Sequence, residues 1–152
     1  MTVRHLILIL GDQLNLDNPA LEDIDLQRDR ILMVEAPAEA SHVWSHKARI
    51  ALFLSAMRHF AETLEQHAFP LIYLKLGEHN FAQLESAWQH YIEILKPQKL
   101  IVCEPGEYRV QQTVQSCADQ AGVSLVIHDD AHFMCSKADF KRWAGNSKNL
   151  RM

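Results

Sequence analysis

Five short apolar runs mark the sequence, and longer amphipathic segments separate most of them. The first run, within residues 5–10, is a series of consecutive leucines and isoleucines that ends at Gly11. A continuous apolar run of this length is typical of a strand that is buried on both faces, as at the centre of a parallel sheet. The remaining runs lie at 31–34, 71–76, 100–103 and 123–127. The sequence therefore predicts five buried strands.

Helical periodicity characterises the segments between these runs. From about residue 41 to 67, apolar side chains recur every three or four positions and polar ones occupy the other side. A second helix is expected to begin at Asn80 as its N-cap and to end before Pro97. A third is expected over 107–121, with Gly122 as its C-cap.

Strands that alternate with helices form right-handed crossovers and a parallel sheet covered on both faces. We therefore expect one α/β domain over residues 1–152, a three-layer, Rossmann-like (flavodoxin-like) doubly wound sheet of five strands. The expected strand order is 3-2-1-4-5. Ligands of such sheets bind where the order reverses, outside the carboxyl ends of the strands. That crevice would lie between the first and fourth strands.

Composition narrows the class of protein. Lys and Arg number 15 against 19 Asp and Glu, a formal charge of −4, which disfavours a free-standing nucleic-acid binder because phosphate contacts need basic side chains. No apolar run approaches the roughly 20 residues that span a bilayer, and the start shows no signal-peptide cleavage site, so a cytoplasmic protein without membrane contact is expected. Three cysteines without CxxC spacing favour neither a disulfide framework nor a zinc knuckle.

The loops expected at the crevice are acidic. They comprise 11–15 after the first strand, 35–39 after the second and 104–109 after the fourth. Neither GxGxxG nor GxxxxGK[ST] occurs, so the backbone cradle for a pyrophosphate is missing. Carboxylates repel phosphate but accept hydrogen bonds from ring N–H groups and sugar hydroxyls, which favours a neutral, hydroxyl-rich heterocycle. The same residues also fit ordinary solvated turns, and at this point both interpretations stay open.

The start of the long helix carries polar candidates for a pocket wall. Glu39, His42 and His46 are spaced i, i+3 and i+7, roughly on one face. A carboxylate and two imidazoles can bind zinc, but HExxH is absent, so pocket lining or helix-start hydrogen bonds are the favoured roles. Phe53 would lie near the same face and could stack on a flat ring or belong to the core. No G-x-S-x-G or matched Cys–His pattern appears, so catalysis by this domain is unsupported.

Three stretches together resemble a known family. They are 8–14, then 39–41 with 50–51 and 55–61, and finally 104–110, and the tail from Phe133 to Met152 is similar as well. The chain resembles the amino-terminal domain of deoxyribodipyrimidine photolyase-related proteins, a prokaryotic cryptochrome/photolyase branch that includes iron–sulfur (6-4) photolyases.

The resemblance implies an antenna domain that binds a ribityl-lumazine and passes light energy to a flavin. It places FAD, an iron–sulfur cluster and the DNA-lesion pocket in a carboxy-terminal helical domain, which is the expected partner and the route to DNA. The family usually has an aliphatic residue near position 53, so Phe53 is expected to narrow the pocket. The implied binding residues are Asp12, Gln13, Leu14, Glu35, Ala36, Glu39, His42, His46 and Phe53.

Two alternatives remain. One is a nucleotide-binding domain of the universal-stress type, which would need a Gly-rich loop after the fourth strand. The other is an interaction domain whose apolar residues near the end dock the helical domain, or drive self-association without it. These residues are Phe133, Met134, Phe140 and Trp143.

Overall fold

The computed structural model describes residues 3–42 and 45–145, with His42 described by its backbone only. The strands are β1 (His5–Leu8), β2 (Arg30–Val34), β3 (Leu71–Leu74), β4 (Lys99–Cys103) and β5 (Ser124–His128). The helices are α1 (Pro37–His42), α2 (Lys47–Gln66), α3 (Leu84–Leu95), α4 (Tyr108–Ala121), α5 (Lys137–Ala144) and the 3-10 turn η1 (Pro19–Leu21).

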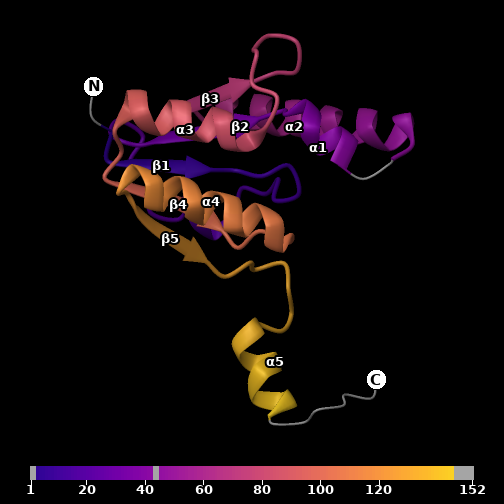
Figure 1. The fold of residues 1–152 in the computed structure, drawn as a ribbon, viewed down its shortest axis with the longest axis vertical. Helices are drawn as coiled ribbons and strands as arrows, with labels where there is room; N and C mark the ends of the chain where they lie inside the picture. Colours follow the sequence, from indigo (N-terminus) through magenta and orange to yellow (C-terminus); the bar gives the residue numbers. More distant parts are fainter. Residues whose placement is uncertain (1–2, 43–44, 146–152) are drawn as a thin grey trace.

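The five strands form one parallel sheet in the order β3-β2-β1-β4-β5, which confirms the expected order. Ile7 of β1 pairs with Ile31 on one side and Ile101 on the other. Helices α3 and α4 cover one face of the sheet, in front in Figure 1, while α2 and η1 cover the opposite face. The molecule therefore has the three layers that the alternation of strands and helices predicts.

Both faces of the central strand are buried, which explains its unbroken apolar run. Leu6 and Leu8 pack into the cluster around Trp88 on the α3–α4 side. Ile7 and Ile9 pack into the opposite cluster, with Met57, Phe60 and Leu64 of α2. Each fully buried aliphatic side chain contributes roughly 1.5–3 kcal/mol, so a polar residue at either face would cost stability.

Two helix boundaries differ from the sequence-based expectation. The single helix expected over 41–67 is two helices, α1 and α2, and residues 43–44 between them lie outside the described part. The helix expected to start at Asn80 begins at Leu84, because the preceding backbone is engaged elsewhere. The Phe81 N–H donates to His79 Nδ1 (3.1 Å), and the Ala82 carbonyl accepts from the Ala38 N–H of α1 (3.0 Å).

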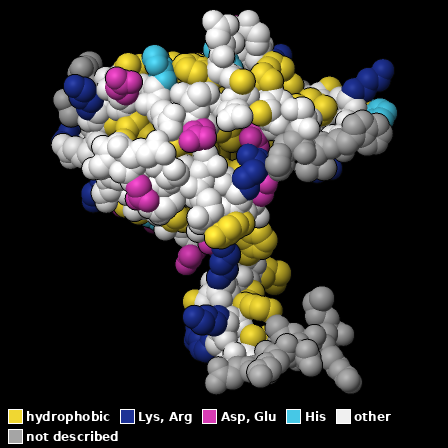
Figure 2. Space-filling view, viewed as in Figure 1, with side chains coloured by type: hydrophobic (Ala, Val, Ile, Leu, Met, Phe, Trp, Pro, Cys, Tyr) yellow, Lys and Arg dark blue, Asp and Glu magenta, His cyan; other side chains and the backbone are white. Residues whose placement is uncertain are grey.

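Helix α5 projects away from the sheet and its covering helices (Figure 1), and none of its residues is buried. An ion pair between Lys137 and Glu104 connects its first turn to the end of β4. Figure 2 shows hydrophobic side chains gathered where the segment that carries α5 leaves the sheet and its covering helices. Within the described ranges, no helix is both long enough and apolar enough to cross a bilayer.

Candidate functional site

A cavity of about 420 Å³ opens at the carboxyl ends of the strands, at the reversal of strand order between β1 and β4. Its apolar walls come from both layers of helices and from the strand ends: Ile9, Leu10, Val34, Ala36, Ile50, Phe53, Leu54, Met57, Leu84, Trp88 and Val110. Its charged lining consists of Asp12, Glu35, Glu39, Arg49, Glu107 and Arg109. The predicted crevice is therefore a hollow with apolar walls and charged groups of both signs.

Phe53 forms the wall directly above the end of β1. A Cβ at Gly11 would lie 2.5 Å from Phe53 Cε1 and 2.9 Å from Met57 Sδ, closer than real side chains approach. The absence of a side chain at position 11 is thus what lets the phenyl ring lie against the backbone there. Phe53 is 45% exposed and belongs to the lining of the cavity.

Glu35 is buried and fully engaged by neighbouring elements. Its two oxygens accept hydrogen bonds from Arg58 Nε and Nη2 (2.9 Å each), from the Leu76 N–H (2.7 Å) and from the Tyr73 hydroxyl. Burial alone would raise the pKa of this carboxyl, but the hydrogen bonds from Arg58, Tyr73 and Leu76 hold the pKa below its ordinary value. Glu35 is therefore an anion that ties the end of β2 to α2 and to the segment after β3.

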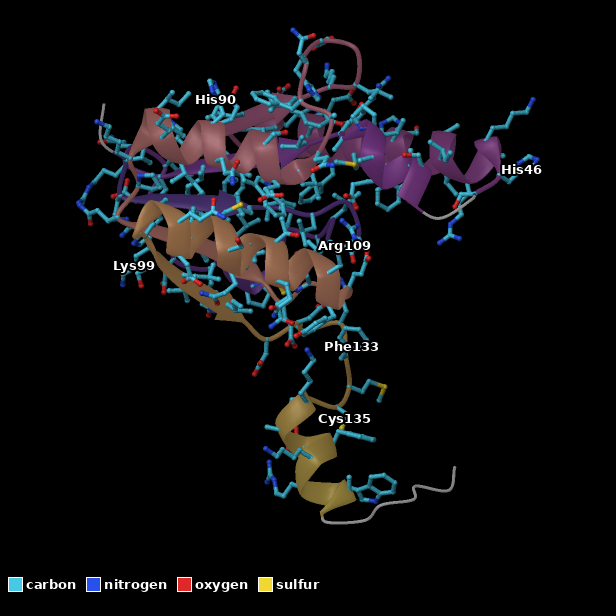
Figure 3. All side chains as sticks on the ribbon, viewed as in Figure 1. His46, His90, Lys99, Arg109, Phe133 and Cys135 are labelled. Atoms are coloured by element: carbon cyan, nitrogen blue, oxygen red, sulfur yellow. The ribbon has the colours of Figure 1, made fainter. Side chains whose placement is uncertain are left out.

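Glu39 pairs with Arg109 in the lining of the cavity. Arg109 Nη2 donates to Glu39 Oε2 (2.8 Å) and Nη1 to Oε1 (3.3 Å), while Arg109 Nε donates to Glu107 Oε1 (2.8 Å). The hydrogen bonds that Arg109 donates to these two carboxylates, first of all to Glu39, raise the pKa of its guanidinium. Figure 3 shows Arg109 at the end of α4 that faces α1. The pair joins these two helices and places fixed donors and acceptors beside the apolar walls.

Asp12 lies on the loop after β1, against Gly106, where a Cβ would come within 3.2 Å of Asp12 Oδ2. Desolvation raises the pKa of the Asp12 carboxyl, the nearby charges of Asp130 and Glu107 raise it further, and a hydrogen bond from its own backbone opposes them. A carboxylate surrounded by other carboxylates is stabilised by any N–H or O–H donor that approaches it.

The other predicted site residues lie outside the described lining of this cavity. Gln13 is buried, and its amide Nε2 donates to the backbone carbonyls of Cys103 (3.2 Å) and Glu104 (2.9 Å). Leu14 packs against the core on the α2 side. His46 is the N-cap of α2, where its Nδ1 accepts from the Ala48 N–H (3.2 Å). The side chain of His42 lies outside the described residues.

The structure thus brings together Asp12, Glu35, Ala36, Glu39 and Phe53 of the predicted set. Glu39 and His46 belong to two different helices, so the predicted common face over 39–46 does not exist. Sequence reasoning gave no role to Arg109, Arg49 or Trp88, although Arg109 lies in the motif 104–110. Its position one residue into a helix beside the crevice is the signal that could have identified it.

The cysteines occupy separate places. Cys103 ends β4 and Cys117 lies in α4, both buried, whereas Cys135 is exposed before α5. Burial raises the pKa of the Cys103 and Cys117 thiols to about 11. In the described part of the chain, no group of three or more His, Cys, Asp or Glu side chains is arranged to hold a metal ion.

The chain is similar in sequence to a known family and to a curated photolyase. The profile of the family described as deoxyribodipyrimidine photo-lyase-related protein matches residues 7–152. A curated relative, the (6-4) photolyase of Agrobacterium fabrum, is 38% identical over 149 residues. The match covers 97% of this chain but 29% of the relative, so the chain spans less than a third of that protein's length. The chain belongs to the deoxyribodipyrimidine photo-lyase-related protein family, as its motifs indicated.

Proposed function

We propose that this chain is the antenna domain of a cytoplasmic, photolyase-related DNA-repair flavoprotein. It binds a ribityl-lumazine at the carboxyl ends of β1 and β4, is not catalytic by itself, and delivers excitation to a flavin held by the rest of the parent protein. The observation that carries the proposal is the cavity at the reversal of strand order, which combines apolar walls with charged side chains in its lining.

The size and chemistry of the cavity suit this ligand class. Its volume of about 420 Å³ lies within the roughly 300–1,000 Å³ of small-molecule sites. The rings of Phe53 and Trp88 and the aliphatic walls suit a flat heterocycle. Four carboxylates against two arginines in the lining disfavour a polyphosphate, while these carboxylates and arginines can serve ring N–H groups, ring carbonyls and hydroxyls. A bound lumazine supplies near-ultraviolet absorption, and the residues of the cavity hold and orient it.

The residues of the site take two kinds of role in this proposal. Asp12 and the Glu39–Arg109 pair contact the ligand's polar groups, and Ala36 and Phe53 contact the ring. Glu35 supports the wall through Arg58, because its oxygens are already engaged. Gln13, Leu14 and His46 fix the loops and helix start around the cavity.

The FAD and the iron–sulfur cluster belong, by this proposal, to the remainder of the parent protein. Thiolates are the ligands of such clusters. Cys103 and Cys117 are buried among apolar residues with raised thiol pKa values, and the exposed Cys135 lies on a different segment. The cysteines of this chain therefore do not fit a cluster site.

The same proposal identifies a binding partner for residues 133–143, the segment that carries α5. Phe133, Met134, Phe140 and Trp143 are 50% exposed or more, and they lie on a segment that leaves the body. Contiguous exposed apolar side chains of this kind mark interaction sites. The relative continues well beyond the matched length. These side chains dock the helical domain, through which the parent protein reaches DNA, and promote self-association of the chain without it.

Titration of the purified chain with ribityl-lumazine tests the proposal. We expect saturable quenching of lumazine fluorescence with one site per chain, and no competition by ATP. Asp12→Ala should weaken binding about tenfold or more, because a hydrogen bond to a charged group contributes roughly 1.5–3 kcal/mol. Asp17→Ala, at an exposed carboxylate outside the cavity lining, is the matched control.

Absence of saturable binding to a folded chain would overturn the antenna assignment, and competition by micromolar ATP would favour the universal-stress alternative. In the parent protein, the action spectrum of flavin photoreduction should contain the near-ultraviolet band of the lumazine. An action spectrum with flavin bands alone, recorded with lumazine bound, would contradict energy transfer.

A further inference from the structure

Residues 75–83 form the loop between β3 and α3, which rises beyond the end of β3 in Figure 1. Two hydrogen bonds join this loop to backbone groups at the junction of β2 and α1. His79 Nε2 lies 3.1 Å from the Glu35 carbonyl, and the Ala82 carbonyl accepts from the Ala38 N–H (3.0 Å). The 75–83 loop thereby connects the start of α1 to the segment that leads into α3.

Both ring nitrogens of His79 are used in holding this loop. Nδ1 accepts from the Phe81 N–H (3.1 Å), two residues further on, while Nε2 faces the Glu35 carbonyl. An acceptor at Nδ1 and a donor at Nε2 exist together only in the neutral tautomer that carries its hydrogen on Nε2. The closed loop therefore requires an uncharged imidazole in one defined tautomer.

Protonation of His79 is incompatible with the turn over residues 79–81. The added proton would occupy Nδ1, where the Phe81 N–H already points, so that two donors would face each other. The Phe81 ring lies 5.7 Å from the imidazole, between ring centroids, and packs against the core cluster on the α3–α4 side. A change at the imidazole therefore reaches the segment that leads into α3.

Titratable groups on the elements around His79 have other partners or lie at the surface. They are Glu35 after β2, Tyr73 of β3, Glu39 of α1, His90 of α3, and Lys75 and Glu78 of the loop itself. Glu35, Tyr73 and Glu39 are engaged in the hydrogen bonds described above, and the other three are exposed. In the described part of the chain, the imidazole bonds to backbone groups alone. The fit of these two groups therefore decides which protonation state the closed loop accepts.

We propose that His79 is a pH-sensitive switch: its neutral ring holds the 75–83 loop against the β2–α1 junction, and protonation releases the loop. Release loosens the contact between α1 and the approach to α3, and both helices line the cavity, through Glu39 and Ala40 and through Leu84 and Trp88. A bound ligand therefore dissociates faster in acid. This last consequence rests on the proposed function, whereas the switch itself does not.

NMR of the purified chain, labelled at the histidine ring nitrogens, tests the switch without any ligand. The titration spans pH 8 to pH 5, on either side of the ordinary imidazole value of about 6.5. At high pH we expect the Nε2–H tautomer of His79 and protection of the Phe81 and Ala38 amides from hydrogen exchange. As the ring takes up its proton, both protection factors should fall about threefold or more, since a lost hydrogen bond changes an equilibrium by roughly two- to tenfold.

His79→Asn separates the charge of the side chain from its role in the turn. An asparagine oxygen accepts from the N–H two residues on, as in an Asx turn, but the amide does not titrate. Protection of the Ala38 amide should therefore stay constant over the same pH range in this variant. His59→Asn is the matched control, because His59 is an exposed histidine of α2 that pairs with Glu62, and it should keep the natural pH dependence.

The same variants test the link to the cavity. With ribityl-lumazine bound, the dissociation rate should rise about threefold or more on acidification in the natural protein and in His59→Asn, but not in His79→Asn. Release of the loop without a faster dissociation would overturn the link to the cavity and leave the proposed function standing.

Two results would overturn the switch itself. One is a protonated His79 ring in a chain whose Phe81 amide stays protected, and the other is a pH dependence of protection that His79→Asn retains. If the chain binds no lumazine, the proposed function fails, and the amide measurements still decide the switch. Should His79→Asn not fold, the natural protein alone suffices, because one titration records both ring protonation and amide protection.

Discussion

At the scale of single residues, the sequence located the polar groups of the site but not their partners. Asp12, Glu35 and Glu39 were expected at the crevice because they follow strand ends, and all three lie at the cavity. That Glu35 is engaged by Arg58 and Tyr73, residues 23 and 38 positions away, follows from packing between elements and has no local signal. A polar residue that follows a strand end is therefore only a candidate for ligand binding, because contacts with other elements can already occupy its hydrogen-bonding groups.

The Glu35–Arg58 pair gives the first prediction. Arg58→Met removes two hydrogen bonds from a buried carboxylate, and we expect the free energy of unfolding to fall by about 1–3 kcal/mol. Urea unfolding followed by circular dichroism measures it. Arg28→Met is the control, because that exposed side chain makes no hydrogen bond with a described residue, and it should change stability by less than about 0.5 kcal/mol. Equal effects of the two substitutions would contradict the role of the pair.

The contact between Gly11 and Phe53 gives the second prediction. Gly11→Ala places a methyl group where the phenyl ring lies, so we expect a loss of about 1–3 kcal/mol from overpacking. Phe53→Ala in the same chain vacates that space, and the double variant should then lose less than the sum of the two single losses. Additive losses in the same unfolding experiment would show that the ring does not oppose the added methyl group.

At the scale of elements, periodicity predicted which helix faces are buried but not where every helix begins. Met57, Ala61 and Leu64 of α2 are buried as the pattern predicts. No glycine or proline separates 41 from 67, so the division into α1 and α2 had no sequence signal. Gly122 at the end of α4 was predicted correctly, because its positive φ of 65° favours glycine.

Helix ends also give the third prediction. Helix α3 ends at Lys96, a residue other than glycine with a φ of 47°, whereas α4 ends at Gly122 in the same left-handed conformation. Lys96→Gly should therefore raise the free energy of unfolding by up to about 1 kcal/mol, and Gly122→Ala should lower it by about as much. Thermal unfolding measures both. A lower melting temperature for Lys96→Gly would contradict the expectation.

At the scale of the whole molecule, strand order and the location of the cavity were both predictable. Buried apolar runs and right-handed crossovers leave few arrangements, and the site follows from where the order reverses. What the sequence could not provide was the wall of the cavity, since Phe53, Trp88 and Arg109 come from three helices whose approach depends on packing.

Global stability should decline in acid. Burial raises the pKa of the Asp29 and Glu35 carboxyls, but hydrogen bonds from Arg4 and Arg58 hold each below its ordinary value of 3.8 or 4.5. Carboxyls with depressed folded pKa values contribute stability that is complete above the ordinary values and is lost as the pH falls through the folded ones.

We therefore expect the urea midpoint to be constant near neutral pH and to fall below about pH 4. In Glu35→Gln the acid-dependent part of this fall should be smaller. A midpoint that rises on acidification would contradict the assignment of these carboxyls.

The projecting helix α5 has a consequence for how the chain meets other molecules. The pair between Lys137 and Glu104 joins it to the body, and exposed ion pairs are worth roughly 0–1 kcal/mol, close to thermal energy. An eight-residue helix without a buried residue gains little stability from packing, so we expect its backbone amides to exchange with solvent earlier than those of the sheet. Its lysines, arginine and aromatic rings lie beyond the sheet and its covering helices, where an approaching surface meets them first. Added salt screens the pair and weakens this contact with the body.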